Sequence, residues 1–386
     1  MTDNINNKKN KVYFVTGGGT GGHIYPAVAV GFALQKEPDT KKVYYIGNPN
    51  NLEKKIAEDK VFDFLGVNIT GMPRTCSFDF VKWSFKLLLA TVKSVGYIFK
   101  YRPNAIFGTG GYVSAPMLFA GLLTRTPVVI HECDAVAGKV TKVIAPFAKS
   151  VSVAFEKSKE GIKSENIHIN GNPIREEFLS TDRYKAREKW NLKDKLTIMV
   201  MGGSQGAKKL NTVLAKNLRQ LFKKYDIQII HQTGLKNYDD TVKELKKVYP
   251  EYTENSRYII RPYFKKMYLP MLASDIAVSR AGSLSISEIC VSGLASVLIP
   301  YPYAAADHQR KNAREMEELN AALYLDDADC TPESFMEKLE ELINDTQKMI
   351  ELQNNAKKLV KYDATGKIVA QIKEVVKYIL LIIILK

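Results

Sequence analysis

Two stretches of the sequence follow one plan: VYFVTGGGTGGH at 12–23 and TIMVMGGSQGAKKLN at 197–211. Each indicates a buried strand, a glycine-rich turn and the start of a helix, which is the unit that opens a Rossmann-like sheet. Because this unit occurs once in each half of a chain of 386 residues, the sequence predicts two α/β domains.

Short apolar, β-branched runs alternate with helical stretches along most of the chain. Continuous apolar strands separated by helices are typical of parallel sheets that helices cover on both faces. The expected strands lie at 12–16, 43–46, 105–108, 127–131 and 151–154, and then at 196–201, 227–231, 276–279 and 296–300. The predicted fold class is therefore α/β, with a Rossmann-like parallel sheet in each domain.

A turn-rich stretch, GNPIREEF at 171–178, precedes a charged helical segment and marks the expected linker. We therefore predict an N-terminal domain over 1–172 and a C-terminal domain over 173–365. A last helix over 366–386 can return to the first domain.

Composition restricts the class of protein and its partners. The chain carries 56 Lys and Arg against 41 Asp and Glu, a net charge of +15. This surplus favours an anionic partner, whether nucleic acid, phosphorylated substrate or anionic lipid, although a lysine-rich composition alone would also produce it. The four cysteines, at 76, 133, 290 and 330, form no CxxC pair, which argues against a zinc site or a disulfide scaffold and favours a reducing compartment.

The two ends of the sequence indicate a cytoplasmic protein. The polar start, MTDNINNKKNK, does not have the pattern of a signal peptide. The apolar stretch at 378–385 is shorter than the roughly 20 residues that span a bilayer. We expect it to be a helix end that packs on the body of the protein.

Three glycine-rich turns predict phosphate binding: GGGTGG at 17–22, GTGGY at 108–112 and GGSQG at 202–206. Glycine allows close approach of the backbone to a ligand, and the N–H groups of the following helix start can face an anion. An NAD site is disfavoured because Asn48 and Pro49, rather than an acidic residue, follow the next strand. No GxxxxGK[ST] motif occurs, which disfavours ATP hydrolysis.

Polar residues follow several of the expected strands. His23 comes directly after the first turn, and Glu132 and Asp134 follow the strand that ends at His131. A structural histidine is as reasonable an interpretation of His23 as a site histidine. In the second half, Glu288 lies on the helix of SRAGSLSISE (279–288), where it can complement the helix dipole or accept from ribose hydroxyls. Gln309 and Asn312, at i and i+3 on one predicted helix, have amides that suit sugar hydroxyls.

The segment FDFVKWSFKLLLATVKSVGYIFKYR at 78–102 predicts a basic amphipathic helix. Such helices lie in the membrane interface, and each lysine near anionic lipid adds about 1 kcal/mol. A helix packed on the sheet with a solvated lysine face is the alternative. The residues expected to contact the membrane are Phe80, Lys82, Trp83, Lys86 and Lys93.

Taken together, these motifs resemble the MurG family of N-acetylglucosaminyltransferases in bacterial cell-wall synthesis. The resemblance runs from about residue 12 to 313, and its motifs come in the same order. They are GGTGGH (18–23), FGTGGYVSAP (107–116), HECDAVAGKVTK (131–142), GNPIR (171–175), GGSQGA (202–207), RAGSLSISE (280–288) and HQRKNA (308–313). The resemblance implies the GT-B architecture, with two Rossmann-like domains facing across a cleft.

The resemblance also implies roles for individual residues. Ser204 would bind the donor diphosphate, Arg175 would contact the nucleotide-sugar across the cleft, and Glu288 would hold the ribose hydroxyls. The backbone of Phe264 would read uracil, and Gln309, with Asn312, would orient the GlcNAc hydroxyls. The other implied substrate-binding residues are Gly282, Ser283 and Leu284 in the donor pocket, and Thr20, Gly21 and Gly22 from the first domain. Asp134 stands where some members carry Asn, so a direct amide contact to the donor is in doubt at this position.

The implied reaction is an inverting transfer of GlcNAc from UDP-GlcNAc to the C4 hydroxyl of MurNAc in undecaprenyl-diphospho-MurNAc-pentapeptide (lipid I), which gives lipid II. It belongs to peptidoglycan synthesis, and so to cell shape and division. We expect His23 as the first candidate for the general base and Glu132 as the second; His23 can instead bind the acceptor diphosphate. No cofactor, metal or nucleic acid is expected, and the enzyme should be peripheral on the anionic cytoplasmic face of the cell membrane.

Other interpretations remain open at the level of sequence. A GT-B diacylglycerol glycosyltransferase shares the donor motifs, a UDP-GlcNAc 2-epimerase uses the same nucleotide-sugar, and a nucleotide-sugar-binding protein needs no turnover. The triplet Asp327-Ala328-Asp329 resembles a metal-binding DxD motif, but Thr331 just after it predicts a helix cap, and we favour the turn-and-cap interpretation.

Overall fold

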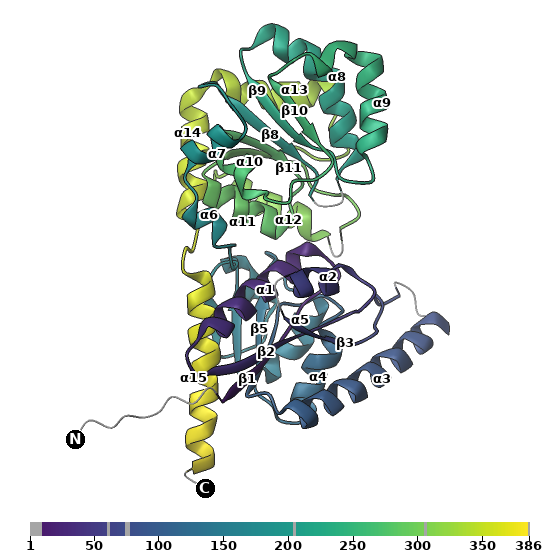
Figure 1. The fold of residues 1–386 in the computed structure, drawn as a ribbon, viewed down its shortest axis with the longest axis vertical. Coiled ribbons are helices and arrows are strands. Elements are labelled where there is room, and N and C mark those ends of the chain that lie inside the picture. The colour runs from purple at the N-terminus through teal and green to yellow at the C-terminus, as the bar shows by residue number, and fades with distance from the viewer. Residues whose placement is uncertain (1–9, 60–61, 74–77, 204–205, 305–306, 385–386) are drawn as a thin grey trace, which may run out of the picture. The chain divides into compact units, whose positions relative to one another are not determined.

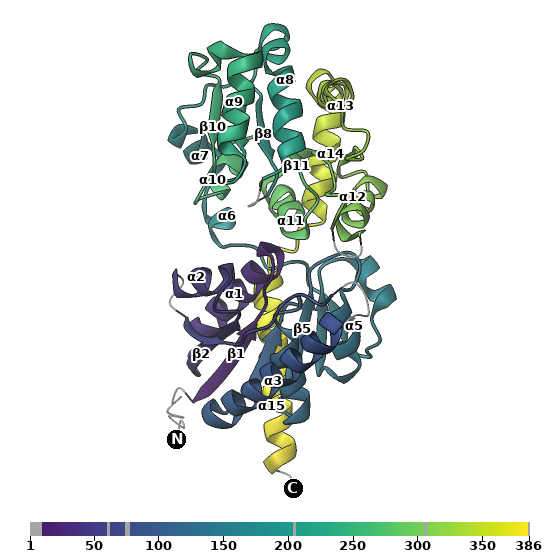
Figure 2. The same cartoon turned by 90° about the vertical axis from the view of Figure 1, so that its right-hand side faces the viewer.

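The computed structural model describes residues 10–59, 62–73, 78–203, 206–304 and 307–384, with side chains as far as Tyr378. The chain forms two compact units (Figures 1 and 2). Unit 1 contains Met1–Ile174 together with Asp363–Lys386, and unit 2 contains Arg175–Tyr362. The chain therefore leaves unit 1 after Ile174 and returns to it at Asp363.

Unit 1 is built on a seven-stranded sheet in which every strand pair is parallel, in the order β3-β2-β1-β4-β5-β6-β7. Its strands are β1 (Lys11–Thr16), β2 (Thr40–Gly47), β3 (Asp63–Gly66), β4 (Ala105–Gly108), β5 (Val128–Glu132), β6 (Ser150–Val153) and β7 (Ile167–Ile169). Its helices are α1 (Gly21–Lys36), α2 (Leu52–Asp59), α3 (Phe78–Tyr101), α4 (Ala115–Leu123), α5 (Lys139–Ile144) and α15 (Ala364–Ile384).

Unit 2 repeats this plan with a six-stranded parallel sheet in the order β10-β9-β8-β11-β12-β13. Its strands are β8 (Thr197–Met201), β9 (Gln228–Gln232), β10 (Tyr258–Arg261), β11 (Ile276–Ser279), β12 (Ala295–Leu298) and β13 (Leu323–Tyr324). Its helices are α6 (Glu177–Ser180), α7 (Arg183–Lys189), α8 (Lys208–Lys224), α9 (Tyr238–Val248), α10 (Tyr268–Leu272), α11 (Ser283–Ser292), α12 (His308–Glu318), α13 (Pro332–Asn344) and α14 (Thr346–Lys358). Both sheets have the strand order of Rossmann-like folds, so the predicted fold class is confirmed.

Each face of the unit 1 sheet has its own hydrophobic core. On one face α1 and α15 pack on the central strands, and on the other α3, α4 and α5 do so. The strands are buried on both sides, which is why they lack the alternating pattern of a half-exposed sheet. In unit 2, the apolar face of α8 repeats at helical spacing, through Leu210, Leu214, Leu218 and Leu221, and packs on the sheet in the same way.

Helix α15 belongs to unit 1 through polar as well as apolar contacts. Ile368 and Ile372 are fully buried in the α1 face of the core. The Gln371 Oε1 atom accepts a hydrogen bond from Asn170 Nδ2 at 2.6 Å, and Gln371 Nε2 donates to Ser150 Oγ at 3.0 Å. The expected packing of the apolar end is not observed at its first residue, because Tyr378 is 65% exposed. The side chains that follow lie outside the described residues.

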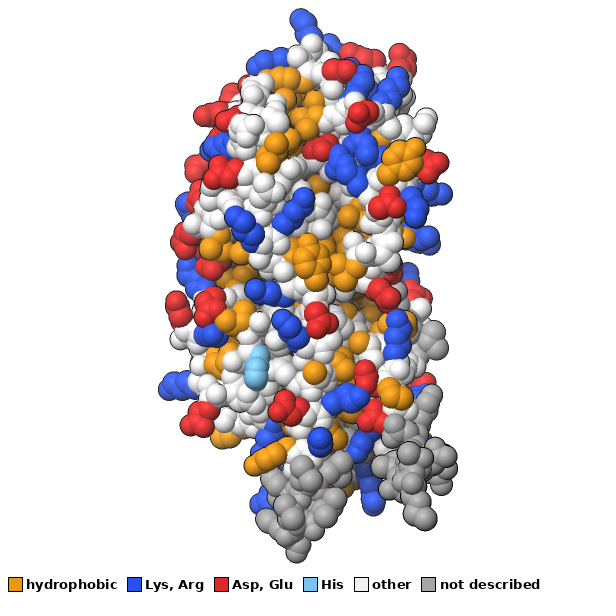
Figure 3. Space-filling view, turned by 90° about the vertical axis from the view of Figure 1, so that its left-hand side faces the viewer, with side chains coloured by type: hydrophobic (Ala, Val, Ile, Leu, Met, Phe, Trp, Pro, Cys, Tyr) orange, Lys and Arg blue, Asp and Glu red, His pale blue; other side chains and the backbone are white. Residues whose placement is uncertain are grey.

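None of the described helices is long and apolar enough to cross a membrane. Cys133, Cys290 and Cys330 are buried free thiols, and Cys76 lies outside the described residues. On the face shown in Figure 3, Lys and Arg side chains are interspersed with Asp and Glu rather than separated from them.

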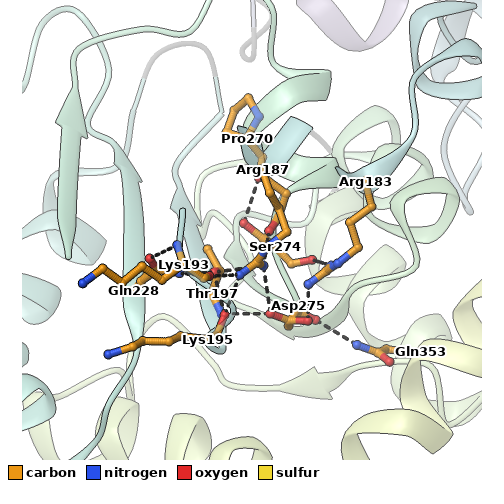
Figure 4. Close-up of polar contacts among 11 residues, drawn as sticks. Arg183, Arg187, Lys193, Lys195, Thr197, Gln228, Pro270, Ser274, Asp275 and Gln353 are labelled. Carbon is orange, nitrogen blue, oxygen red and sulfur yellow. Dashed lines mark hydrogen bonds and ion pairs between the residues drawn. The ribbon is translucent and has the colours of Figure 1, made fainter. Parts of the chain in front are cut away.

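A polar cluster ties the amino-terminal edge of the unit 2 sheet to α7 (Figure 4). Asp275 precedes β11, and its Oδ2 atom accepts from the backbone N–H of Thr197 at 2.8 Å, while its Oδ1 atom pairs with Arg183 Nη2 at 2.6 Å. Arg187 donates to the Ala273 carbonyl at 2.9 Å. Because the Asp275 side chain is only 20% exposed, water could not fully replace its hydrogen bonds to these partners if the carboxylate were removed.

We predict that Asp275→Ala destabilises unit 2 by about 2–4 kcal/mol, because it leaves the Thr197 N–H without its acceptor and removes the carboxylate that pairs with Arg183. Thermal and urea unfolding, followed by circular dichroism, would measure the loss. Asp226→Ala is the matched control, because Asp226 is 67% exposed and pairs with Lys195 on the surface. Equal loss of stability in the two variants would contradict the prediction.

Candidate active site

Two glycine-rich turns meet at the carboxyl edge of the unit 1 sheet. The first follows β1 and the second follows β4, which is paired with β1 so that Thr16 lies beside Gly108. A Cβ atom on Gly111 would lie 2.3 Å from the Gly18 carbonyl oxygen, and Gly111 has a φ of +73°. The two turns therefore touch through their backbones at a distance that no side chain permits.

His23 lies where these turns meet. It is in the first turn of α1, after Thr20 as the N-cap and the glycines at 21 and 22. Its Nδ1 atom is 3.1 Å from Thr20 Oγ1, and its backbone carbonyl accepts from Thr109 Oγ1 at 2.5 Å. A Cβ on Gly110 would lie 3.4 Å from the imidazole ring. The ring thus packs over the second glycine turn, at the edge where parallel sheets bind ligands.

A buried carboxylate that the sequence analysis missed lies behind the first turn. Glu53 is fully buried, and its Oε1 atom accepts from the Asn48 N–H at 3.3 Å and from Asn51 Nδ2 at 3.4 Å. Asn51 Nδ2 also donates to the Tyr112 hydroxyl at 3.3 Å. Since the Tyr112 ring covers Gly19, this chain of contacts connects both turns to the loop after β2.

Glu132 organises the loop that follows β5. It is 3% exposed, and its Oε1 and Oε2 atoms accept from the backbone N–H groups of Asp134, at 3.1 Å, and Gly138, at 2.9 Å. Burial, followed by the charge of Asp134, raises the pKa of Glu132 to about 7, although its hydrogen bonds, including one with Thr141, oppose the rise. Both carboxylate oxygens therefore hold the loop.

His131, next to Glu132, is a neutral structural histidine. Asn172 Nδ2 donates to the Cys133 carbonyl, so Asn172 Oδ1 is the acceptor for the Nε2–H of His131 at 3.0 Å. The Nδ1 atom then accepts from Ser152 Oγ at 2.9 Å. Burial lowers the pKa of His131 to about 4, so the ring is uncharged at neutral pH.

In unit 2, the corresponding glycine turn follows β8. Gly206 has a φ of +77°, and a Cβ there would lie 2.0 Å from the Thr233 carbonyl oxygen, so this turn also packs on backbone. Ser204 lies outside the described residues. Phe264 follows β10; its N–H donates to Gln232 Oε1 at 2.8 Å and its ring packs edge-on against Trp190 at 5.2 Å. Phe264 and Trp190 also line a pocket of about 290 Å³ together with Arg261, Lys265 and other residues.

Glu288 and Arg175 form an ion pair within unit 2. Arg175 Nη2 is 2.6 Å from Glu288 Oε1, and the Arg175 guanidinium also lies over the Phe178 ring. Burial raises the pKa of Glu288 above its ordinary value, and the charge of Arg175 opposes this rise. Glu288 lies on α11, whose N-cap is Gly282 and whose first turn contains Ser283 and Leu284. The pair therefore lies one to two turns from the predicted donor loop.

The two amides of α12 point in different directions. Gln309 Oε1 accepts from the Tyr301 N–H at 2.9 Å and is partly accessible. Asn312 is fully buried, and its Nδ2 atom donates to the Ala281 carbonyl at 3.2 Å. A spacing of three residues places two side chains near one face, but the packing of α12 against the loop before α11 turns Asn312 inward. In the structure Asn312 therefore supports the donor loop from behind.

The Asp327–Asp329 triplet has structural partners. Asp327 Oδ1 pairs with Arg280 Nη1 at 2.6 Å, and Lys209 donates to the Asp327 carbonyl. Thr331 caps α13 through a reciprocal capping box with Ser334, which confirms the expected cap. Among the described residues, no three His, Cys, Asp or Glu side chains are grouped as a metal site would need.

Comparison with known proteins gives matches over nearly the whole chain. The models of the glycosyltransferase family 28 N-terminal and C-terminal domains match residues 13–153 and 197–371. The UDP-N-acetylglucosamine–N-acetylmuramyl-(pentapeptide) pyrophosphoryl-undecaprenol N-acetylglucosamine transferase of Halothermothrix orenii is 35% identical over 366 residues, which are 94% of this chain and 98% of that protein. The Bacillus subtilis enzyme of the same name is 33% identical, with 94% and 99% covered. The crystal structure of Acinetobacter baumannii MurG has a TM-score of 0.73 at 28% identity, covering 95% of this chain and all of that one.

The chain belongs to the MurG family. It is a glycosyltransferase of family 28 with two parallel-sheet domains of the GT-B type, as the order of its motifs predicts. Similarity to more distant structures shows the fold alone: the UDP-GlcNAc 2-epimerase of Neisseria meningitidis has a TM-score of 0.66 at 14% identity, covering 95% of this chain and all of that one.

In this member of the MurG family, we predict that Glu132 makes the stability of unit 1 depend on pH. Because its pKa is about 7 in the folded chain, against an ordinary value of 4.5, the folded state binds the proton more tightly. Its contribution to stability is therefore present below pH 4.5 and is lost as pH rises through 7. His131 acts in the opposite sense, because its pKa of about 4 makes stability rise between pH 4 and 6.5.

The difference between wild type and Glu132→Gln isolates the carboxyl. Between pH 5 and 8, the melting temperature of wild type should fall relative to that of the variant. Only the wild type has a carboxyl group at position 132 that gives up its proton in this range. Scanning calorimetry over this range would measure the difference. A constant offset between the two proteins at every pH would contradict the prediction.

Proposed function

We propose that this chain transfers GlcNAc from UDP-GlcNAc to the C4 hydroxyl of MurNAc in undecaprenyl-diphospho-MurNAc-pentapeptide, so that lipid I becomes lipid II. The observation that carries the proposal is the glycine-rich carboxyl edge of the sheet in each unit, together with the residues that the family motifs imply there. The relatives that match over 94% of the chain are named as N-acetylglucosamine transferases for UDP-N-acetylglucosamine and N-acetylmuramyl-(pentapeptide) pyrophosphoryl-undecaprenol.

The donor is assigned to unit 2. No described side chain caps α8 or α11, and neither helix has an acidic residue in its first turn, so the first-turn N–H groups can receive an anion. The diphosphate would lie at the start of α8, with Ser204. Glu288 pairs with Arg175 in the structure. In the complex, the ribose hydroxyls would donate to Glu288, and Arg175 could then contact the nucleotide-sugar.

The acceptor diphosphate is assigned to unit 1. Helix α1 also begins without a side-chain cap or an acidic first turn, and the backbones of both glycine turns line the same edge. In the reaction, the C4 oxygen forms a bond to C1 of GlcNAc as the bond from C1 to UDP breaks. His23 would take the hydroxyl proton, and the α8 start would stabilise the charge that develops on UDP. Glu132 suits the base role less well, since both of its oxygens hold the loop after β5.

Our third prediction is that the purified full-length chain makes lipid II and UDP from lipid I and labelled UDP-GlcNAc with EDTA present. His23→Ala should lower kcat by about 10²–10⁴, the usual contribution of a general base, with little change in UDP-GlcNAc affinity. His168→Ala is the control, because His168 is an exposed histidine on β7 that bonds to Asn166.

The alternatives give different products. Transfer to diacylglycerol but not to lipid I would establish the lipid glycosyltransferase, and formation of UDP-ManNAc would establish the epimerase. Binding without turnover would establish a sensor. An unchanged kcat in His23→Ala would refute the assignment of the base.

We further propose that α3 docks on the anionic cytoplasmic face of the membrane. The side of α3 that does not pack on unit 1 exposes large apolar residues at helical spacing: Phe78, Val81, Phe85, Leu88, Leu89, Val92 and Phe99 are each 53–73% exposed. Lys82, Lys86 and Lys93 are exposed on the same helix. Such a surface suits the boundary between lipid headgroups and acyl chains.

Two of the expected contact residues have other partners. The Trp83 Nε1–H donates to the Thr70 carbonyl at 2.8 Å, and its ring packs against Phe80 at 5.8 Å, so both aromatic side chains are partly buried. Sequence periodicity could not anticipate the segment at Thr70 that covers them. The apolar contribution to docking is therefore reassigned to Phe85 and its exposed neighbours.

The prediction for α3 is that changing Lys82, Lys86 and Lys93 to Gln weakens binding to vesicles containing phosphatidylglycerol by about 100-fold, at about 1 kcal/mol for each lysine. Vesicle sedimentation measures this. Changing Lys243, Lys246 and Lys247 on α9 to Gln removes the same charge from exposed positions on unit 2 and is the control. Equal weakening in both triple variants would show that net charge, rather than α3, governs binding.

A further inference from the structure

Gln232, the last residue of β9, is fully buried at the carboxyl edge of the unit 2 sheet. Its strand lies between β8 and β10. Its side-chain amide joins the segments that follow those two strands: Oε1 accepts from the Phe264 N–H at 2.8 Å, and Nε2 donates to the Gly203 carbonyl at 3.3 Å. The side-chain amide thus uses its acceptor for one segment and its donor for the other.

The backbone around Gln232 strengthens the same connection. The Thr233 N–H donates to the Arg261 carbonyl, in the last residue of β10, at 3.1 Å, so the pairing of the two strands continues one residue beyond β9. The Thr233 carbonyl lies directly against Gly206, where a Cβ would be 2.0 Å away. The last residue of β9 and the residue after it therefore support Gly203 and Gly206 of the glycine turn, and Gln232 also supports the segment that contains Phe264.

Phe264 is fixed from two sides. Its ring packs edge-on against Trp190, and its N–H points inward to Gln232. If the backbone of Phe264 reads the base, the carbonyl oxygen is then the group that meets it. A carbonyl oxygen accepts from the N3–H of uracil, whereas N3 of cytosine is itself an acceptor and would be repelled.

We infer that Gln232 is a positioning residue for the nucleotide, which sets selectivity for uracil through Phe264 and aligns the diphosphate turn through Gly203. This inference rests on the proposed use of a UDP-sugar. Gln232 does not touch the ligand itself, so its effect is transmitted through the two backbone segments that it joins.

The test compares two substitutions in full-length protein. Gln232→Met keeps the length of the side chain and removes both hydrogen bonds, so KM for UDP-GlcNAc should rise about tenfold. The ratio of kcat/KM for UDP-GlcNAc to that for CDP-GlcNAc should fall by a similar factor. Gln232→Glu keeps an acceptor for the Phe264 N–H but sets a carboxylate oxygen against the Gly203 carbonyl, so KM should rise while the ratio stays close to that of wild type.

Gln228→Met is the matched control. Gln228 begins the same strand and is 4% exposed, and its amide also holds backbone: it accepts from the Lys193 N–H at 2.9 Å and donates to the Lys193 carbonyl at 3.0 Å. It lies at the opposite end of β9, in the cluster of Figure 4. Gln228→Met should lose a similar amount of thermal stability and keep the wild-type KM and nucleotide ratio.

These measurements distinguish failure of the positioning role of Gln232 from failure of the proposed function. If wild type binds UDP-GlcNAc by calorimetry but Gln232→Met keeps the wild-type KM and ratio, the role of Gln232 is overturned and the proposed function stands. Equal shifts in Gln228→Met and Gln232→Met would also overturn it, because general destabilisation would then explain both. If wild type does not bind UDP-GlcNAc, both the function and the inference fall. Should Gln232→Met not fold, an unchanged KM in Gln232→Glu would overturn the inference.

Discussion

The close approach of backbone to backbone at the carboxyl edges of the two sheets is the constraint on which the rest of the structure depends. Gly111 lies against the Gly18 carbonyl, and Gly206 lies against the Thr233 carbonyl. Neither contact leaves room for a Cβ atom, so the turns can lie against one another only as glycine. This packing brings loops from several strands to one edge of each sheet, where α1 and α11, which carry His23 and Glu288, begin without a cap from any described side chain.

Buried polar side chains hold these turns in place, and each does so through backbone groups. Glu53 supports the loop after β2, Glu132 supports the loop after β5, and Gln232 joins the segments after β8 and β10. A buried carboxylate or amide is costly unless its hydrogen bonds are made, so Glu132 and Gln232, whose side-chain oxygens and amide are hydrogen-bonded, each favour one loop conformation. Glu53 is bonded through Oε1, while its buried Oε2 atom has no hydrogen-bond partner among the described residues. The residues that would touch substrate therefore depend on buried residues that would not.

Much of the fold followed from pattern alone. The duplicated strand–turn–helix unit predicted two parallel sheets, and the apolar runs located their central strands. The strands that the sequence analysis missed, β3, β7, β10 and β13, lie at the edges of the sheets or are very short. Edge strands are half covered and carry polar residues such as Asp63 and His168, so they lack the continuous apolar run by which buried strands are recognised.

By itself, the sequence determined the fold class, the glycine turns and the order of motifs that places the chain in the MurG family, because these depend on local periodicity and on backbone geometries that only glycine accepts. Tertiary structure decided which polar residues are buried and which backbone groups they hold in place. Asn312 is buried against the Ala281 carbonyl, Trp83 donates to the Thr70 carbonyl, and both oxygens of Glu132 accept from its own loop. Gln232 joins two backbone segments, which is the basis of its proposed positioning role and which no sequence motif indicates. These outcomes depend on segments far apart in the chain, whose packing no local pattern records.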